Sequence, residues 1–224
     1  MKESDLYPVV ERWMNREWGC FASKTDTGTK LGRIDVAGIR DIGGDLSGQT
    51  EVIAIEVKPG GTVFTTSAGQ AFGYSVYADR VYLADYRPAG EWYTPQELAI
   101  AGKLGLGLLL IRPNNRINVV QTSPLHQPLE ALRRRVIDAM EYATCSICET
   151  VFRRAEGKRE LVKRSDRPRT GGIRGAVRSG EGYVWWLEGA AERDGSGRKY
   201  IHPRRYLCAD CASGLFHEFI ADDE

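Results

Sequence analysis

Apolar residues recur at helical spacing near the start of the chain and follow strand-like patterns further along. Residues 4–18 predict a helix with Ser4 as its cap, because apolar side chains return every three or four positions. Strands are predicted around 20–24, 32–39, 51–58, 80–84, 106–111 and 117–120, and further helices over 67–78, 95–104 and 129–142. The order α-β-β-β-α-β-α-β-β predicts an α/β domain, a mixed sheet flanked by helices.

The character of the chain changes near residue 143. Beyond it long apolar runs are rare, while arginines, glycines and two cysteine pairs become frequent. We therefore expect two domains, 1–143 with the sheet and 144–224 as a smaller module.

The overall composition is that of a soluble globular protein, with 42% hydrophobic and 27% charged residues. The longest apolar run, 104–111, is far too short to cross a bilayer, and the polar start of the chain does not resemble a signal peptide. We expect a cytoplasmic protein with no membrane partner. The net charge of +1 does not restrict the class of partner.

Four of the five cysteines form two Cys-x-x-Cys pairs, Cys145 with Cys148 and Cys208 with Cys211. In a cytoplasmic protein this spacing favours a metal site over disulfides, and four thiolates around one ion are typical of structural Zn²⁺. The pattern resembles a zinc ribbon or a treble-clef finger, with a short helix expected over 213–220. An iron–sulfur cluster that also uses Cys20 is the alternative.

Two acids and a lysine are placed unusually in the first domain. Asp35 lies between apolar residues on a predicted strand, and Glu56 and Lys58 end a strand otherwise suited to the core. Because strand side chains alternate, Glu56 and Lys58 point the same way. If Asp35 comes from the adjacent strand, the carboxylates can share an Mg²⁺ ion, which takes one or two carboxylates besides water and phosphate. The simpler alternative is a strand-end ion pair of Glu56 and Lys58, with Asp35 in a turn.

The order of these residues resembles the PD-(D/E)XK nuclease superfamily over roughly residues 3–122. Asp35 in Gly-Arg-Ile-Asp is similar to the aspartate motif of the RecB-like branch, and Glu56-x-Lys58 ends the following strand. Gln70 and Tyr74 are similar to that branch's Gln-x-x-x-Tyr motif. The chain departs from the family pattern in having Ile34, not proline, before the aspartate, but many members also lack that proline. The resemblance implies a restriction-endonuclease-like mixed sheet and hydrolysis of phosphodiester bonds in DNA.

Roles follow from the resemblance residue by residue. Asp35 and Glu56 would be ligands of Mg²⁺ (or Mn²⁺) together with the backbone carbonyl of Val57, and Lys58 would be the catalytic lysine. Gln70 and Tyr74 would position Lys58 or the substrate phosphate. The family often adds an acid from the first helix, for which Glu3 and Glu11 are both candidates and Glu3 is preferred.

The 59 residues between the cysteine pairs are rich in basic side chains. From 153 to 205 there are 15 Lys and Arg against 7 Asp and Glu, a balance of +8, with aromatic residues nearby. Such a segment suits phosphate contact and base stacking, and the alternative is a solvated hairpin. The candidate nucleic-acid-binding residues are Arg153, Arg154, Lys163, Arg164, Arg167 and Arg169.

Together these patterns predict an Mg²⁺-dependent DNA endonuclease or exonuclease whose zinc module helps to bind nucleic acid. A homodimer is one expected assembly, because nucleases of this kind often act as dimers to cut both strands. Two other functions stay open: a non-catalytic nucleic-acid-binding protein on a degenerate nuclease fold, and a zinc-stabilised adaptor for an acidic partner.

Overall fold

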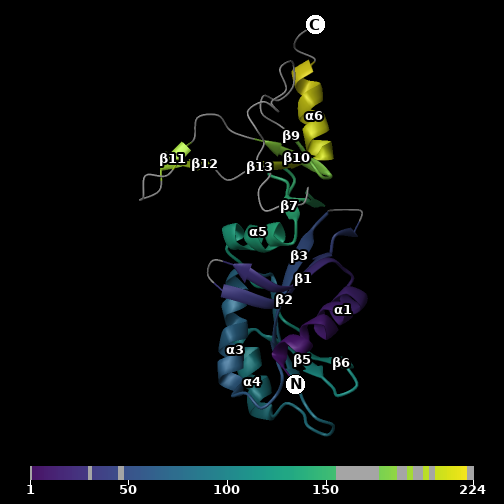
Figure 1. The fold of residues 1–224 in the computed structure, drawn as a ribbon, viewed down its shortest axis with the longest axis vertical. Helices are drawn as coiled ribbons and strands as arrows, with labels where there is room; N and C mark the ends of the chain where they lie inside the picture. Colours follow the sequence, from purple (N-terminus) through teal and green to yellow (C-terminus); the bar gives the residue numbers. More distant parts are fainter. Residues whose placement is uncertain are drawn as a thin grey trace. The chain divides into compact units, whose positions relative to one another are not determined.

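A computed structural model of the chain describes residues 2–29, 32–44, 48–154, 177–185, 191–193, 199–201 and 205–220. The chain divides into two compact units, Met1–Met140 and Glu141–Glu224. The change in composition along the sequence predicts this division three residues later, after Ala143. Each unit is described separately below (Figure 1).

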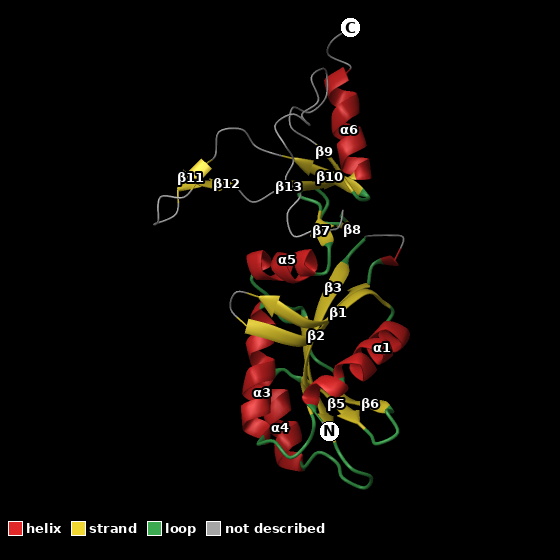
Figure 2. Cartoon of the chain, in the orientation of Figure 1, coloured by secondary structure: helices red, strands yellow, loops and turns green. Residues whose placement is uncertain are grey.

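The first unit contains one sheet and the helices on its two faces (Figure 2). Its elements are η1 (Glu3–Asp5), α1 (Tyr7–Trp18), β1 (Cys20–Thr29), β2 (Gly32–Asp41), β3 (Thr50–Lys58), α3 (Phe64–Gly73), η2 (Tyr74–Val76), β4 (Arg80–Tyr86), α4 (Pro95–Leu104), β5 (Gly107–Ile111), β6 (Ile117–Gln121) and α5 (Glu130–Ala139). The sheet order is β1-β2-β3-β4-β5-β6. β3, β4 and β5 are parallel to one another, and the other neighbours are antiparallel. The predicted α/β fold, a mixed sheet flanked by helices, is confirmed.

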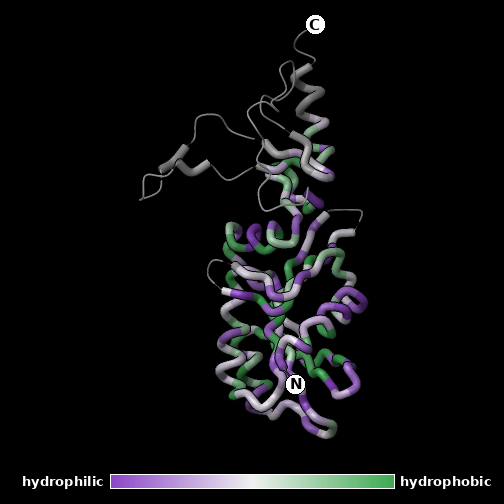
Figure 3. Tube along the Cα trace, viewed as in Figure 1, coloured by the Kyte–Doolittle hydropathy of each residue, from purple (hydrophilic) through white to green (hydrophobic). Residues whose placement is uncertain are grey.

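The core lies on both sides of the central strands, where Figure 3 shows hydrophobic stretches gathered. On one face, the apolar side of α1 packs against Ile53, Ile55 and Val57 of β3 and their neighbours. α3 and α4 contact β3, β4 and β5 and cover the other face (Figure 2). β3 is buried from Glu51 to Lys58. A charged residue at its end is therefore held inside the protein.

Some predicted boundaries differ from the structure. The first helix begins at Tyr7, not at Ser4, because residues 3–5 form a 3₁₀ turn in which the Asp5 carboxylate accepts a hydrogen bond from the Lys2 backbone N–H. The first strand runs to Thr29, because its whole length pairs with β2. The last helix of the unit ends at Ala139, two residues before Glu141, whose φ of 68° is left-handed. The helix predicted over 67–78 is α3 followed by the 3₁₀ turn η2.

The second unit consists of short strands and one helix. Its elements are β7 (Tyr142–Thr144), β8 (Val151–Arg153), β9 (Val177–Ser179), β10 (Gly182–Trp185), β11 (Ala191–Arg193), β12 (Lys199–Ile201), β13 (Arg205–Cys208) and α6 (Ala209–Ile220). β13, β10 and β9 form one sheet, and β7–β8 and β11–β12 are separate pairs. A small core that includes Phe152 and Leu207 surrounds two cysteines. α6 begins four residues earlier than the helix expected over 213–220.

No helix in the described part of the chain has both the length and the apolar character needed to cross a bilayer.

Candidate active site and candidate metal centre

The two predicted acids come from neighbouring antiparallel strands. Asp35 is on β2 and Glu56 on β3, and the ladder between these strands pairs Val36 with Ile55. Continuing this register by one position sets Asp35 opposite Glu56, where directly opposed Cβ atoms are roughly 5 Å apart. The Asp35 carboxylate also accepts a hydrogen bond of 2.8 Å from the Val57 backbone N–H. The two acids therefore lie side by side on one face of the sheet, and Asp35 is not in a turn.

A chain of hydrogen bonds joins these acids to the lysine and to the first helix. The Lys58 ammonium lies 2.6 Å from a Glu56 oxygen and 3.1 Å from a Glu3 oxygen. The Tyr7 hydroxyl lies 2.9 Å from the second Glu3 oxygen and 2.9 Å from an Asp35 oxygen. We call Glu3, Tyr7, Asp35, Glu56 and Lys58 the acid–lysine network. It connects η1 and α1, at the start of the chain, with β2 and β3, which follow later in the sequence.

The helix acid in this network is Glu3. Glu11, the other candidate, instead accepts a hydrogen bond from the Ser23 hydroxyl, 2.9 Å away. Sequence analysis did not identify Tyr7 as a site residue. Its position four residues after Glu3 is the only signal in the sequence that these side chains share one helical face.

Tyr74 contacts the acid–lysine network, whereas Gln70 does not. The Tyr74 hydroxyl lies within hydrogen-bond distance of the Glu56 carboxylate and of the Arg33 carbonyl oxygen, at 2.7 Å from the latter. Burial and the neighbouring carboxylate raise the pKa of Tyr74, so its hydroxyl remains a donor at neutral pH. Gln70 is exposed on α3, and no hydrogen bond within the described part of the network involves it.

Burial sets the electrostatics of the site. Glu56 is 4% exposed and Lys58 8% exposed. The pKa of Asp35 is raised from 3.8 to about 6, chiefly by burial; the charges of Glu56 and Glu3 add to the rise, and the hydrogen bonds from Val57 and Tyr7 oppose it. Burial lowers the pKa of Lys58, but its hydrogen bonds to the two glutamates outweigh this, so its pKa is raised. Lys58 is therefore a charged ammonium at neutral pH.

A second buried acid on the same sheet shows how unusual Asp35 is. Glu51 is 3% exposed, and Arg40 and Arg80 both donate hydrogen bonds to its carboxylate, so its pKa is lowered despite burial. Asp35 has no such partner among the described residues. With all groups ionised, the three carboxylates and the one ammonium of the network carry a net charge of −2. The site holds more negative charge than its own cation balances.

As placed, the three acids are not assembled around a common point. Among the described residues, the one group of three or more acidic, histidine or cysteine side chains close enough to hold an ion is the cysteine quartet. Lys58 lies between Glu3 and Glu56, and Tyr7 between Glu3 and Asp35. An ion bound by Asp35 and Glu56 would therefore require Lys58 to move from its pairing with Glu56.

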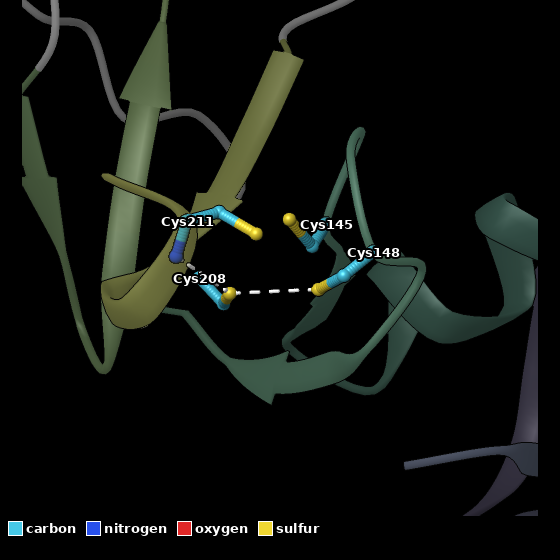
Figure 4. A group of neighbouring side chains, drawn as sticks. All are labelled: Cys145, Cys148, Cys208 and Cys211. Atoms are coloured by element: carbon cyan, nitrogen blue, oxygen red, sulfur yellow. Dashed lines mark hydrogen bonds between the residues drawn. The ribbon is translucent and has the colours of Figure 1, made fainter. Parts of the chain in front are cut away.

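The four cysteines of the second unit gather their sulfur atoms at one point (Figure 4). Cys145 and Cys148 lie in the turn between β7 and β8, Cys208 ends β13, and Cys211 lies in the first turn of α6. The four sulfurs lie within 4.8 Å of one another. Around a tetrahedral Zn²⁺ with bonds near 2.3 Å, sulfurs are roughly 3.8 Å apart. The quartet can hold a metal ion such as zinc.

Contacts within the quartet hold the sulfur atoms close together. The sulfurs of Cys148 and Cys208 are 3.6 Å apart, and the Cys211 backbone N–H donates to the Cys208 sulfur over 3.4 Å. Cys20 takes no part in this cluster. It is buried in the core of the first unit, where burial raises the pKa of its thiol to about 12. A protonated, buried thiol is a poor metal ligand.

Few of the predicted nucleic-acid-binding residues fall in the described part of the chain. Arg153 ends β8 and is exposed. Arg154 follows it but is 6% exposed, so its side chain does not offer a surface for phosphate contact. Lys163, Arg164, Arg167 and Arg169 lie outside the described residues.

Comparison with models of protein families finds no match to this chain, and comparison with curated proteins finds no significant match. Its function is therefore inferred from its own residues.

Proposed function

We propose that this chain is a metal-dependent nuclease of the PD-(D/E)XK type that hydrolyses phosphodiester bonds in DNA. The observation that carries the proposal is the acid–lysine network. In it the buried Lys58 pairs with Glu56 of β3 and Glu3 of η1, Tyr7 links Glu3 to Asp35 of β2, and negative charge is in excess. A restriction-endonuclease-like domain has the same mixed sheet, with its acid and Glu-x-Lys motif on adjacent strands. Tyr74, the tyrosine of the Gln-x-x-x-Tyr motif, lies beside Glu56 and adds support.

Asp35, Glu56 and the Val57 carbonyl are the groups that would hold Mg²⁺ or Mn²⁺. Carboxylate and carbonyl oxygens are the ligands that these ions prefer. The N–H and C=O of one strand residue point to the same neighbouring strand, so the Val57 carbonyl is directed towards the side on which its N–H meets Asp35. When bound, the ion lowers the pKa of a coordinated water and offsets negative charge on the phosphoryl group.

The protein side chains then hold and orient the reactants. Lys58, released from Glu56, is placed to orient the attacking water and to stabilise its deprotonated form, because its raised pKa keeps the ammonium charged. Tyr7 ties Asp35 to Glu3 and fixes the direction of both carboxylates. Tyr74 donates a hydrogen bond to the Glu56 carboxylate and helps to orient it.

The second unit would be a structural zinc module. A pair of cysteines in a β-turn and a second pair entering a helix are the arrangement of a treble-clef finger, and four thiolates leave no open position for catalysis. Its proposed role is to hold nucleic acid, based on the +8 charge balance of residues 153–205.

The test is cleavage by the purified full-length protein on single-stranded, duplex and branched DNA with Mg²⁺ or Mn²⁺. We expect Lys58→Ala and Glu56→Gln each to lower the rate by roughly 100-fold or more, because each removes a charge placed at the reacting phosphate. Glu11→Gln is the matched control, since it makes the same Glu-to-Gln change on α1, outside the network, and should cleave normally. Equal rates for all four proteins would refute the proposal.

One observation favours a second function, a nucleic-acid-binding protein on a nuclease fold that has lost catalysis. The Lys58 ammonium already pairs with Glu3 and Glu56, so the network is partly neutralised without any ion. That function predicts a salt-dependent shift of DNA in a gel, no cleavage with either metal, and unchanged binding in Lys58→Ala.

A further inference from the structure

The loop from Arg87 to Thr94 is fixed by hydrogen bonds from two arginines. It follows β4, at the edge of the sheet where the parallel strands end. Arg87 donates to the Trp92 carbonyl oxygen over 2.7 Å. Arg112 donates to the carbonyl oxygens of Pro88 and Glu91 over 2.8 and 2.7 Å. The loop is thus held at both of its ends and at its middle.

This rigid loop nevertheless leaves a tryptophan half in solvent. Trp92 is 50% exposed, whereas its neighbour Tyr93 is 3% exposed and packs under the Arg87 guanidinium, 4.1 Å from the ring centre. The Arg112 guanidinium lies 5.5 Å from the centre of the Trp92 ring. A single exposed apolar side chain is ordinary on a protein surface. Here, however, the backbone beside Trp92 is held by hydrogen bonds, so the point from which the ring projects is set by the fold.

The position of Trp92 relates it to the acid–lysine network. Lys58 pairs with Asp85 across β3 and β4, and Tyr86 pairs with Ile111 across β4 and β5, one residue before Arg112. β5 is two strands from β3, or roughly 10 Å. By the alternation of strand side chains, Arg112 points to the same face of the sheet as Lys58. A span of this order corresponds to a few nucleotides of a nucleic-acid strand.

We propose that Trp92 stacks on an unpaired nucleobase of the substrate, a few nucleotides from the bond held at Lys58. This inference rests on the proposed function and adds a substrate class to it, nucleic acid with a single-stranded segment. A base inside a duplex is already stacked on its neighbours, whereas an unpaired base offers a free face to an aromatic ring.

The charges around Trp92 favour a base over a phosphate as its partner. Arg112 hydrogen-bonds to backbone carbonyls and forms no ion pair within the described part of the chain, so its charge is retained beside the ring. The Arg87 charge is taken up by Asp85 and Glu97. The loop also carries the acidic Glu91, so Glu91 and Arg112 together contribute no net charge. The net charge of the loop therefore gives little attraction for phosphate, and the aromatic surface is what remains for recognition.

The experiment measures binding of the full-length protein, without added Mg²⁺, to short single-stranded oligonucleotides that carry 2-aminopurine at one position at a time. We expect Trp92→Ala to weaken binding about 5- to 150-fold, the range for loss of one stacked base. 2-Aminopurine fluorescence should be quenched at one position in the wild-type complex and not in the variant. Trp92→Phe should restore most of the affinity, because a phenyl ring also stacks.

The matched control is Phe72→Ala, which removes another exposed aromatic side chain. Phe72 is 44% exposed and lies near the C-terminal end of α3. It should bind as the wild type does. Thermal unfolding of each variant checks that the fold is intact, and the Trp92 carbonyl that accepts from Arg87 is present in all of them. Equal affinity for wild type and Trp92→Ala would overturn the proposal, whether or not the protein cleaves DNA.

Failure of the proposed function gives a different result. A protein that cleaves no nucleic acid but shows Trp92-dependent binding and quenching is not a nuclease, yet it stacks a base as proposed. A protein that cleaves duplex DNA with unchanged activity in Trp92→Ala is a nuclease that does not use this tryptophan. No binding and no cleavage would refute both.

Discussion

Replacing Asp35 by asparagine should stabilise the metal-free protein while it removes activity. Burial and the charges of Glu56 and Glu3 make an ionised Asp35 unfavourable in the folded state, which is why its pKa is raised to about 6. Asparagine has nearly the same shape and no charge. Its carbonyl oxygen can accept from the Val57 N–H, and its amide can donate to the Tyr7 oxygen, so both contacts survive the change.

The size of the effect follows from the shift in pKa. A rise from 3.8 to about 6 is two units, and each unit corresponds to about 1.4 kcal/mol, which sets an upper limit of about 3 kcal/mol. Because Asp35 is only half-buried, solvent screening reduces this to about 1–2 kcal/mol. For a unit of 140 residues, this gain in unfolding free energy raises the melting temperature by roughly 3–8 °C.

The gain depends on pH in a defined direction. A raised pKa in the folded state means that the folded protein binds the proton more tightly than the unfolded chain does. Below pH 3.8 Asp35 is protonated in both the folded and the unfolded protein, so it does not lower the free energy of unfolding. Above about pH 6 it is ionised in both, and it lowers the free energy of unfolding by the full amount. The advantage of Asp35→Asn should be absent near pH 4, grow up to pH 6 and stay constant above it.

Differential scanning calorimetry of the full-length protein, from pH 4 to pH 8 in magnesium-free buffer, measures this difference. Asp26→Asn is the control, because it removes the same charge from an exposed side chain that pairs with Arg33. Asparagine also tolerates the left-handed φ of 52° at that position. We expect this control not to raise the melting temperature.

Adding Mg²⁺ extends the same experiment to the proposed metal site. The ion should raise the melting temperature of the wild type, because it binds the folded state, and leave Asp35→Asn unchanged. Two results would show that an ionised Asp35 does not destabilise the folded protein. One is a lower melting temperature for Asp35→Asn than for the wild type at pH 8, and the other is a difference in melting temperature that does not change with pH. Equal stabilisation of both proteins by Mg²⁺ would remove Asp35 from the metal site.

Two further predictions concern the cysteine quartet and the packing of the sheet. Cys208→Ser should lower the zinc content from one ion per chain, as measured by zinc release to a chromophoric chelator. Cys20→Ser should leave the zinc content unchanged, because Cys20 lies in the core of the first unit. The reverse result would exclude the quartet as the zinc site. Gly107→Ala should cost about 2–3 kcal/mol in urea unfolding, because the new methyl group would overlap the buried Tyr82 ring. Gly69→Ala, with open space at its Cβ position, should be neutral or stabilising, and equal costs for both would contradict this packing.

The sequence predicted most of the helices and strands of the first unit. Apolar periodicity is a local property, and it located β3 to within one residue and α4 without error. The least accurate boundaries were those set by partners distant in the sequence. β1 extends to Thr29 only because β2 pairs with it, and α5 ends early at a left-handed Glu141.

Some of the site residues could likewise be predicted from local sequence patterns, and others could not. The pattern of charged residues on apolar strands singled out Asp35, Glu56 and Lys58, because a buried charge in a core strand is visible from its neighbours alone. The same holds for the cysteine quartet, whose spacing is itself the signal. These choices needed no tertiary information.

What tertiary structure alone decided is which side chains meet. The network uses Glu3 and not Glu11, it includes Tyr7, and it leaves Gln70 in solvent. These contacts depend on strand order and on the packing angle of α1 against the sheet, and neither is written in any local pattern. A sequence gives the face on which a side chain lies within its own element, but a contact between elements follows only from the register and packing that bring them together.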